Sequence, residues 1–180
     1  MSTKKELSER DICTKFILPA LIKAGWDVAT QIREEVYFTD GRIFVKGNKT
    51  VRGERKRADF ILYLKPNIPV AVIEAKDNNH SVGAGLQQAL GYAKILDIPA
   101  AFSSNGDGFV QHDLSGFTPI IEKELSLDAF PSPNELWQMY KKHKKITTPE
   151  QEEAASFDYF FDGSGRSPRY YQQIAINRTV

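Results

Sequence analysis

The clearest pattern along this chain is a pair of short apolar runs, at residues 60–64 and 70–73. Both runs are rich in branched or aromatic residues, which is typical of β-strands, and the second is apolar throughout, as in a strand buried on both faces. The connection between them, residues 65–69, contains two prolines and an asparagine and predicts a turn. We therefore expect two strands that pair as a hairpin.

A helical pattern follows at residues 82–96, where leucine and alanine recur at intervals of three and four. Gln88 and Tyr92 are four residues apart, so in a helix they are neighbours on one face, beside the apolar stripe. The glycines in this stretch weaken a helix but allow the backbone to approach the sheet or a ligand closely.

Weaker signals complete an outline of strands and helices. Ser8, with Asp11 three residues later, predicts the capped start of a first helix that ends near Gly25. Pro19 interrupts the helical hydrogen bonds, so we expect a kink or a restart there. The remaining predicted elements are strands at 43–45, 100–102 and 108–112, and a helix that begins at 132–137. This order predicts an α/β fold.

Composition agrees with one globular domain and a tail. The chain has 180 residues, of which 41% are hydrophobic and 26% charged, so it can bury one core. The single cysteine, Cys13, excludes an intramolecular disulfide and a cysteine-cluster zinc site, and the three scattered histidines predict no histidine metal site. No apolar run approaches transmembrane length and the amino terminus is polar, so we expect a cytoplasmic protein without a membrane partner.

Charged residues lie at the open end of the predicted hairpin, opposite its turn. Asp59 enters the first strand, and Glu74 and Lys76 leave the second on one face, because side chains alternate along a strand. Magnesium is commonly held by one or two carboxylates, and a lysine can orient the attacking water or stabilise the transition state. The three groups predict a phosphodiesterase site that uses a divalent metal. The alternative is a solvated charge pair at a strand end.

Three motifs carry a resemblance to a known family: Asp59, Glu74-Ala75-Lys76 and Gln88-x-x-x-Tyr92. Their order resembles the PD-(D/E)xK nuclease superfamily, specifically the amino-terminal nuclease domain of the restriction, or motor, subunit (R) of type I restriction enzymes. The segments at 8–11 and 24–27 are also similar to such subunits, and Ala58 departs from the proline in the superfamily name. The resemblance covers essentially the whole chain. It implies a PD-(D/E)xK restriction-endonuclease-like core, with a mixed sheet flanked by helices.

By this resemblance, the chain is expected to hydrolyse phosphodiester bonds in double-stranded DNA, with Mg²⁺ or Mn²⁺ as cofactor and with modification and specificity subunits as partners. The expected catalytic residues are Asp59, Glu74, Lys76, Gln88 and Tyr92. The expected metal ligands are Asp59, Glu74, the main-chain carbonyl of Ala75 and, as a further candidate, Glu9. Two alternatives stay open: a non-catalytic DNA-binding or docking module of the motor subunit, and a stand-alone nuclease of the resolvase kind.

Charge is unevenly distributed, although the net charge is only +1. Residues 42–57 contain seven lysines and arginines and a single glutamate, and this run reaches the strand that contains Asp59. Such a run can hold DNA phosphates next to the metal site. The predicted DNA-binding residues are Arg52, Arg55, Lys56 and Arg57. A solvated hairpin without DNA contact is the alternative.

Residues 168–175 are similar to the Arg-x-Tyr-Gln-x-x-Ala segment that opens the motor core of superfamily 2 translocases. The similarity implies that Arg169, Tyr171 and Gln172 bind nucleotide in a longer parent protein, which would use ATP. The sequence contains no Gly-x-x-x-x-Gly-Lys-Ser/Thr phosphate loop, so we expect no ATP hydrolysis by this chain. The expected parts are a nuclease core at 1–113, a helical or irregular extension and linker at 114–165, and a stub of the motor domain at 166–180.

Overall fold

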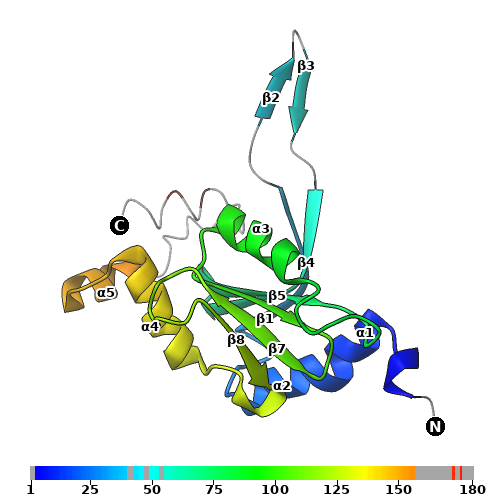
Figure 1. The fold of residues 1–180 in the computed structure, drawn as a ribbon. Helices are drawn as coiled ribbons and strands as arrows, with labels where there is room; N and C mark the ends of the chain where they lie inside the picture. Colours follow the sequence, from blue (N-terminus) through cyan, green and yellow to red (C-terminus); the bar gives the residue numbers. More distant parts are fainter. Residues whose placement is uncertain are drawn as a thin grey trace.

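A six-stranded mixed sheet forms the centre of the molecule, in the order β1-β4-β5-β6-β7-β8 (Figure 1). The computed structural model describes residues 3–39, 43–46, 49–52, 55–156, 172 and 175, with the backbone alone at 43–46 and 49–52. The strands are β1 (Ile32–Thr39), β4 (Arg55–Lys65), β5 (Ile68–Ala75), β6 (Ala100–Ser104), β7 (Gly108–Asp113) and β8 (Glu122–Ser126). β5 and β6 run parallel, and the other neighbouring pairs run antiparallel.

Helices cover both faces of the sheet (Figure 1). They are α1 (Glu9–Ile12), α2 (Leu18–Lys23), α3 (Leu86–Leu96), α4 (Pro133–Lys144) and α5 (Pro149–Ser156). α3 packs on one face, in a cluster with Ile61 and Val72, while α1, α2 and α4 pack on the other face with Phe60 and Ile73. The predicted fold class is therefore confirmed: a mixed sheet flanked by helices.

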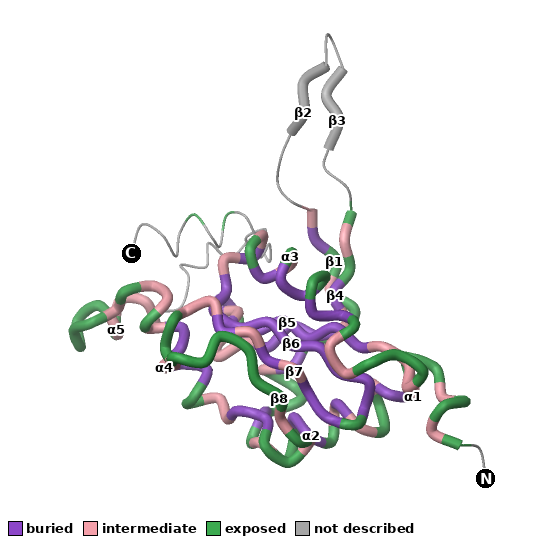
Figure 2. Tube along the Cα trace, in the orientation of Figure 1, coloured by how far each residue is buried: buried purple, intermediate pink, exposed green. Residues whose placement is uncertain are grey.

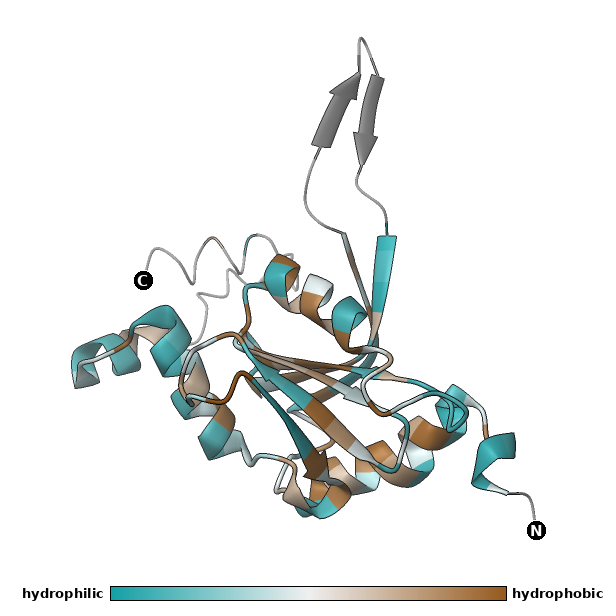
Figure 3. Ribbon diagram, viewed as in Figure 1, coloured by the Kyte–Doolittle hydropathy of each residue, from teal (hydrophilic) through white to brown (hydrophobic). Residues whose placement is uncertain are grey.

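The predicted hairpin is confirmed as β4 and β5, which pair antiparallel with Phe60 opposite Ile73. β5 is buried almost throughout, as its continuous apolar sequence predicts, and it lies at the centre of the buried region in Figure 2. Figure 3 shows hydrophobic residues gathered on the central strands and hydrophilic residues at the start of β4 and along α5. The predicted strand at 43–45 lies in β2 (Ile43–Lys46), which pairs with β3 (Lys49–Arg52) in a separate two-stranded sheet.

The first helical segment begins as its sequence predicts. The Ser8 hydroxyl accepts a hydrogen bond from the backbone N–H of Asp11, and the Asp11 carboxylate accepts one from the backbone N–H of Ser8. The helix widens into a π-helical stretch at Cys13–Ile17 and restarts as α2 at Leu18. The restart agrees with the proline at position 19, which has no N–H to continue the hydrogen-bond ladder.

α3 begins later than its apolar pattern predicts. We expected a helix from residue 82, but α3 starts at Leu86, and the glycines at 83 and 85 lie in the preceding turn. Glycine loses much conformational entropy in a helix, so a turn here costs less than an extended α3. The backbone before α3 then passes close to the end of β5, where Glu74 lies.

Two elements of the predicted extension at 114–165 join the core. β8 pairs with β7, and Phe130, Leu136 and Tyr140 are buried in the cluster on the α1 and α2 face. The division of the chain at residues 113 and 165 stays a prediction. Of the predicted motor stub, only Gln172 and Ala175 are described, both exposed and helical, while Arg169 and Tyr171 lie outside the described residues.

Candidate metal centre

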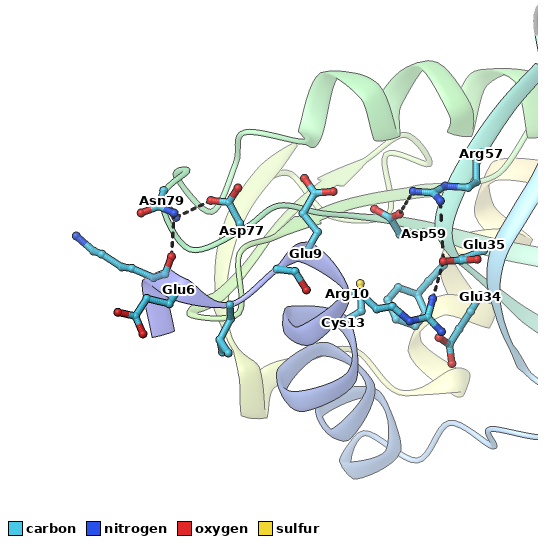
Figure 4. Close-up of a pocket in the computed structure, with 14 residues that line it drawn as sticks. Glu6, Glu9, Arg10, Cys13, Glu34, Glu35, Arg57, Asp59, Asp77 and Asn79 are labelled. Atoms are coloured by element: carbon cyan, nitrogen blue, oxygen red, sulfur yellow. Dashed lines mark hydrogen bonds and ion pairs between the residues drawn. The ribbon is translucent and has the colours of Figure 1, made fainter. Parts of the chain in front are cut away.

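A cleft of about 720 Å³ lies between the amino-terminal helical segment, the middle of β1 and β4, and the loop after β5 (Figure 4). It is lined by Lys5, Glu6, Leu7, Ser8, Glu9, Arg10, Cys13, Glu34, Glu35, Arg57, Asp59, Phe60, Asp77 and Asn79. Six of these side chains are carboxylates. Such a concentration of negative charge favours the binding of cations.

Pairing of β4 with β5 brings Asp59 and Glu74 together. Because Phe60 is opposite Ile73, the next step of the ladder sets Asp59 beside Glu74. The Asp59 Oδ2 atom accepts a hydrogen bond of 2.8 Å from the backbone N–H of Ala75. This bond fixes one carboxylate oxygen against β5. The hairpin thus gathers the two acids that the sequence analysis selected.

The carboxyl group of Glu74 is buried in the protein interior. Only 1% of the residue is exposed, and its Oε1 atom has no hydrogen-bond partner among the described residues. Burial, followed by the nearby charge of Asp59, raises the pKa of Glu74 to about 8, while Lys76 acts in the opposite direction. A buried carboxylate without compensation is costly, so this oxygen suits a bound cation.

Lys76 and Glu9 complete the group of charges. The Lys76 backbone N–H donates to the Ser104 carbonyl at 2.8 Å, which extends the pairing of β5 with β6 by one residue. Its Nζ atom lies 3.7 Å from Glu9 Oε1, and Glu9 is the first residue of α1. The capped helix start therefore carries Glu9 to the carboxyl end of β5, close to Glu74.

These residues fit a hard divalent cation that keeps part of its water shell. Within the described part of the chain, no group of three or more His, Cys, Asp and Glu side chains is arranged to hold a metal ion by itself. Mg²⁺ is usually held by only one or two carboxylates together with waters and substrate oxygens. Asp59 and the unpartnered oxygen of Glu74 supply that number.

Comparisons with known proteins identify homologues of the chain. No family model matches the chain. The chain is 50% identical over 175 residues to the type I restriction enzyme EcoAI endonuclease subunit of Escherichia coli. Homologues of this chain are endonuclease subunits of type I restriction enzymes. The match covers 97% of this chain but only 22% of that subunit.

A solved structure supports the same relationship. The chain is 40% identical, with a TM-score of 0.77, to a fragment structure described as that of an HsdR subunit of a type I restriction enzyme from Vibrio vulnificus YJ016. The match covers 96% of this chain and 32% of that chain. The fold described above is thus shared with a type I restriction subunit over nearly the whole chain.

The expected auxiliary pair of the type I restriction family lies on α3. Gln88 Nε2 donates a hydrogen bond of 3.0 Å to the hydroxyl of Tyr92, and the Tyr92 ring packs edge-on against Phe38 with the ring centroids 5.0 Å apart. The structure therefore brings the two residues to each other. Neither is among the described residues that line the cleft. Their role in a reaction stays a prediction.

One of the predicted DNA-binding residues lines the cleft. Arg57 lines it, with Nη2 3.8 Å from Asp59 Oδ1. Arg55 stacks over the Tyr37 ring, 4.0 Å from its centroid, and Lys56 pairs with Phe38 along β1. The side chain of Arg52, in β3, lies outside the described residues.

Sequence reasoning missed the acids of β1, Glu34 and Glu35, and it missed Arg10 and Asp77 as cleft residues. β1 contains three charged residues in succession, which conceal the alternation that identifies a strand. The apolar and aromatic residues that flank these charges could have identified this segment as a strand. Asp77 follows the Glu-Ala-Lys motif directly and could have been included with it.

The turn before α3 offers a matched pair of substitutions. A Cβ atom at Gly85 would lie 3.0 Å from the Glu74 Cβ and 3.1 Å from the Ser103 hydroxyl, whereas a Cβ at Gly91 meets nothing within 4 Å. Gly85→Ala should therefore displace Glu74 and weaken metal binding about tenfold or more. Gly91→Ala should keep metal affinity and stabilise α3 by about 0.5–1 kcal/mol. Metal titration and thermal unfolding of both variants check these effects, and equal metal affinities would contradict the close packing.

Proposed function

We propose that this chain is the DNA endonuclease part of the R subunit of a type I restriction enzyme, and that it depends on a divalent metal. The observation that carries the proposal is the buried Glu74 carboxylate beside Asp59, whose Oε1 atom has no hydrogen-bond partner among the described residues, with Lys76 two residues further along the chain. The printed name of the E. coli relative, an endonuclease subunit, supports it. Because the chain spans 22% of that relative, the activity of the whole protein belongs to this proposal.

Asp59, Glu74 and the carbonyl of Ala75 would hold the metal, with Glu9 as a further ligand. Mg²⁺ suits these oxygens and Mn²⁺ can replace it. When bound, the metal supplies an acidified water and neutralises charge on the scissile phosphate. The hydrogen bond from Ala75 N to Asp59 fixes one of the two ligands before metal arrives. Such preorganisation reduces the rearrangement needed at the moment of reaction.

Lys76 would act on the substrate directly. Its ammonium group can orient the attacking water or stabilise the negative charge that develops on the phosphate, and its ion pair with Glu9 keeps it at the cleft before DNA binds. Gln88 and Tyr92 carry an amide and a phenol, which suit hydrogen bonding to phosphate or to a metal-bound water. We propose that this pair tunes DNA engagement and does not bind metal.

The proposed partners follow from the same assignment. Double-stranded DNA would approach along Arg52, Arg55, Lys56 and Arg57, and the modification and specificity subunits would complete the restriction complex in the cytoplasm. ATP would be used by a motor in the parent protein, where Arg169, Tyr171 and Gln172 would contact nucleotide. None of the described helices is long and apolar enough to cross a membrane.

The assignment is tested by cleavage of circular duplex DNA by the reconstituted restriction complex, with ATP present. Asp59→Ala should abolish cleavage, and chelation of divalent metal should stop the wild-type enzyme. Glu34→Gln removes another acid from the same cleft and should cut at the wild-type rate. If Asp59→Ala cuts as fast as Glu34→Gln, the chain is not the nuclease and a non-catalytic docking role takes its place.

A further inference from the structure

Glu35 has a backbone conformation that is unusual within a β-strand. Its φ is 50°, in the left-handed region that residues other than glycine rarely adopt. Two other described residues that are not glycine, Asp97 and Lys145, have positive φ, and each ends a helix, where this conformation is ordinary. Glu35 instead lies in the middle of a strand. Strain of this kind persists at functional sites where the surrounding structure enforces it.

The strained residue interrupts the ladder between β1 and β4 at the level of Asp59. The ladder between β1 and β4 pairs Glu34 with Phe60 and Val36 with Ala58, so the step between these pairs belongs to Glu35 and Asp59. Two like charges directly opposite one another destabilise an antiparallel sheet. Here the two carboxylates have different partners, because Asp59 is bonded to the Ala75 N–H, while Glu35 is paired with arginines.

Glu35 joins two arginines from different elements. Its Oε1 atom accepts a hydrogen bond of 2.7 Å from Arg10 Nη1 in α1 and lies 3.9 Å from Arg57 Nη1 in β4. Figure 4 shows Arg57 between Asp59 and Glu35, at the wall of the cleft. The Glu35 and Arg10 side chains are 47% and 73% exposed. An exposed ion pair adds little stability, so the pair does not account for the strain.

The arginines have the chemistry of a phosphate site. Arg10 and Arg57 are the only guanidinium groups among the described residues lining the cleft, whose other charged side chains are mostly acids. Arg57 is 3.8 Å from Asp59 and 3.9 Å from Glu35, distances longer than a hydrogen bond. Among the described residues its hydrogen-bond partner is Tyr37, so its remaining donors are able to turn to another anion. A guanidinium group binds a phosphate through two parallel hydrogen bonds.

We propose that Glu35 is a positioning residue that holds Arg10 and Arg57 at the wall of the cleft, where they bind a phosphate of the DNA backbone beside the metal centre. This inference rests on the proposed nuclease function and deepens it. The left-handed conformation at Glu35 directs its carboxylate to the two arginines and leaves Asp59 to the metal. DNA thus meets two aligned cations in a cleft that would otherwise repel it.

The test compares two neighbouring acids of the same cleft. Binding of the 180-residue chain to a labelled DNA duplex is measured by fluorescence anisotropy with Ca²⁺ in place of Mg²⁺. Glu35→Gln should weaken binding about tenfold, since the arginines lose the group that aligns them. Glu34 has no arginine partner among the described residues, so Glu34→Gln removes the same charge and should bind as tightly as the wild type or more tightly. Glu35→Asp keeps the charge and should retain most of the affinity.

Unchanged or tighter binding by Glu35→Gln would overturn the proposal, because a carboxylate that only repels DNA gives that result. The assay requires no cleavage, so its outcome is separate from the cleavage test of Asp59→Ala.

A second comparison tests the backbone strain at Glu35. Glu35→Gly and Glu35→Ala both remove the carboxylate, but glycine alone adopts positive φ without strain. The glycine variant should melt at the higher temperature, and equal melting temperatures would contradict strain at this residue.

Discussion

Replacing Lys76 with alanine should lower the rate of DNA cleavage by about a hundredfold or more, as the loss of an electrostatic stabiliser commonly does. The ammonium group lies beside Glu9 at the cleft and acts on the charge of Glu74, so its removal leaves the attacking water and the phosphate without their cation. The rate is measured in single-turnover cleavage by the reconstituted restriction complex. ATP-driven translocation, which we assign to another part of the parent protein, should stay at the wild-type rate.

Metal binding has to be separated from the chemical step in this experiment. Lys76 lowers the pKa of Glu74, so its loss makes that carboxylate harder to ionise and should weaken metal binding at neutral pH. Cleavage should therefore be compared at saturating metal. Lys5→Ala, which removes the lysine that lines the cleft, serves as the control and should cut normally. Equal rates for the two variants would show that Lys76 has no catalytic role.

The second large effect concerns the stability of the metal-free protein. The pKa of Glu74 is raised from 4.5 to about 8, so between these values the folded protein holds a proton that the unfolded chain has released. The free energy of unfolding should therefore fall as the pH rises from about 5 to about 8, by an amount on the order of a few kcal/mol. Glu74→Gln removes the ionisable group and should remove this dependence.

Chemical denaturation in the presence of a chelator, at pH 6 and at pH 8.5, measures the effect. The wild type should be less stable at the higher pH, while Glu74→Gln should be nearly equally stable at both. Glu34→Gln should follow the wild type, because Glu34 is exposed and the variant keeps Glu74. A wild-type protein with the same stability at both values would mean that the pKa of Glu74 is not raised in the folded protein.

The hairpin that carries the metal centre was predictable because its signals are local. Residues 60–64 and 70–73 are short apolar runs around a proline turn, and the alternation of side chains then places Glu74 near Asp59. The Ser8 cap was predictable for the same reason, since the capping box spans only four residues. These features depend on neighbours in sequence.

The features that escaped prediction depend on contacts distant in sequence. Strand β1 presents Arg33, Glu34 and Glu35 in succession, and its position at the edge of the sheet is decided by pairing with β4. The partner of Glu35 is Arg10, 25 residues away, on another element. No pattern in the sequence identifies a left-handed glutamate within a strand. The burial of Glu74 likewise follows from the approach of the turn at Gly85 and from Ser103 in β6.

The central claim is a divalent-metal site between Asp59 and Glu74, and calorimetric titration of Mn²⁺ into wild-type protein and Asp59→Ala tests it most directly. The wild type should bind Mn²⁺, with Mg²⁺ competing for the same site, and Glu34→Gln should bind it equally well. In Asp59→Ala the binding heat should disappear, because Glu74 alone cannot hold the ion against its own desolvation. Undiminished affinity for Mn²⁺ in Asp59→Ala would contradict the site.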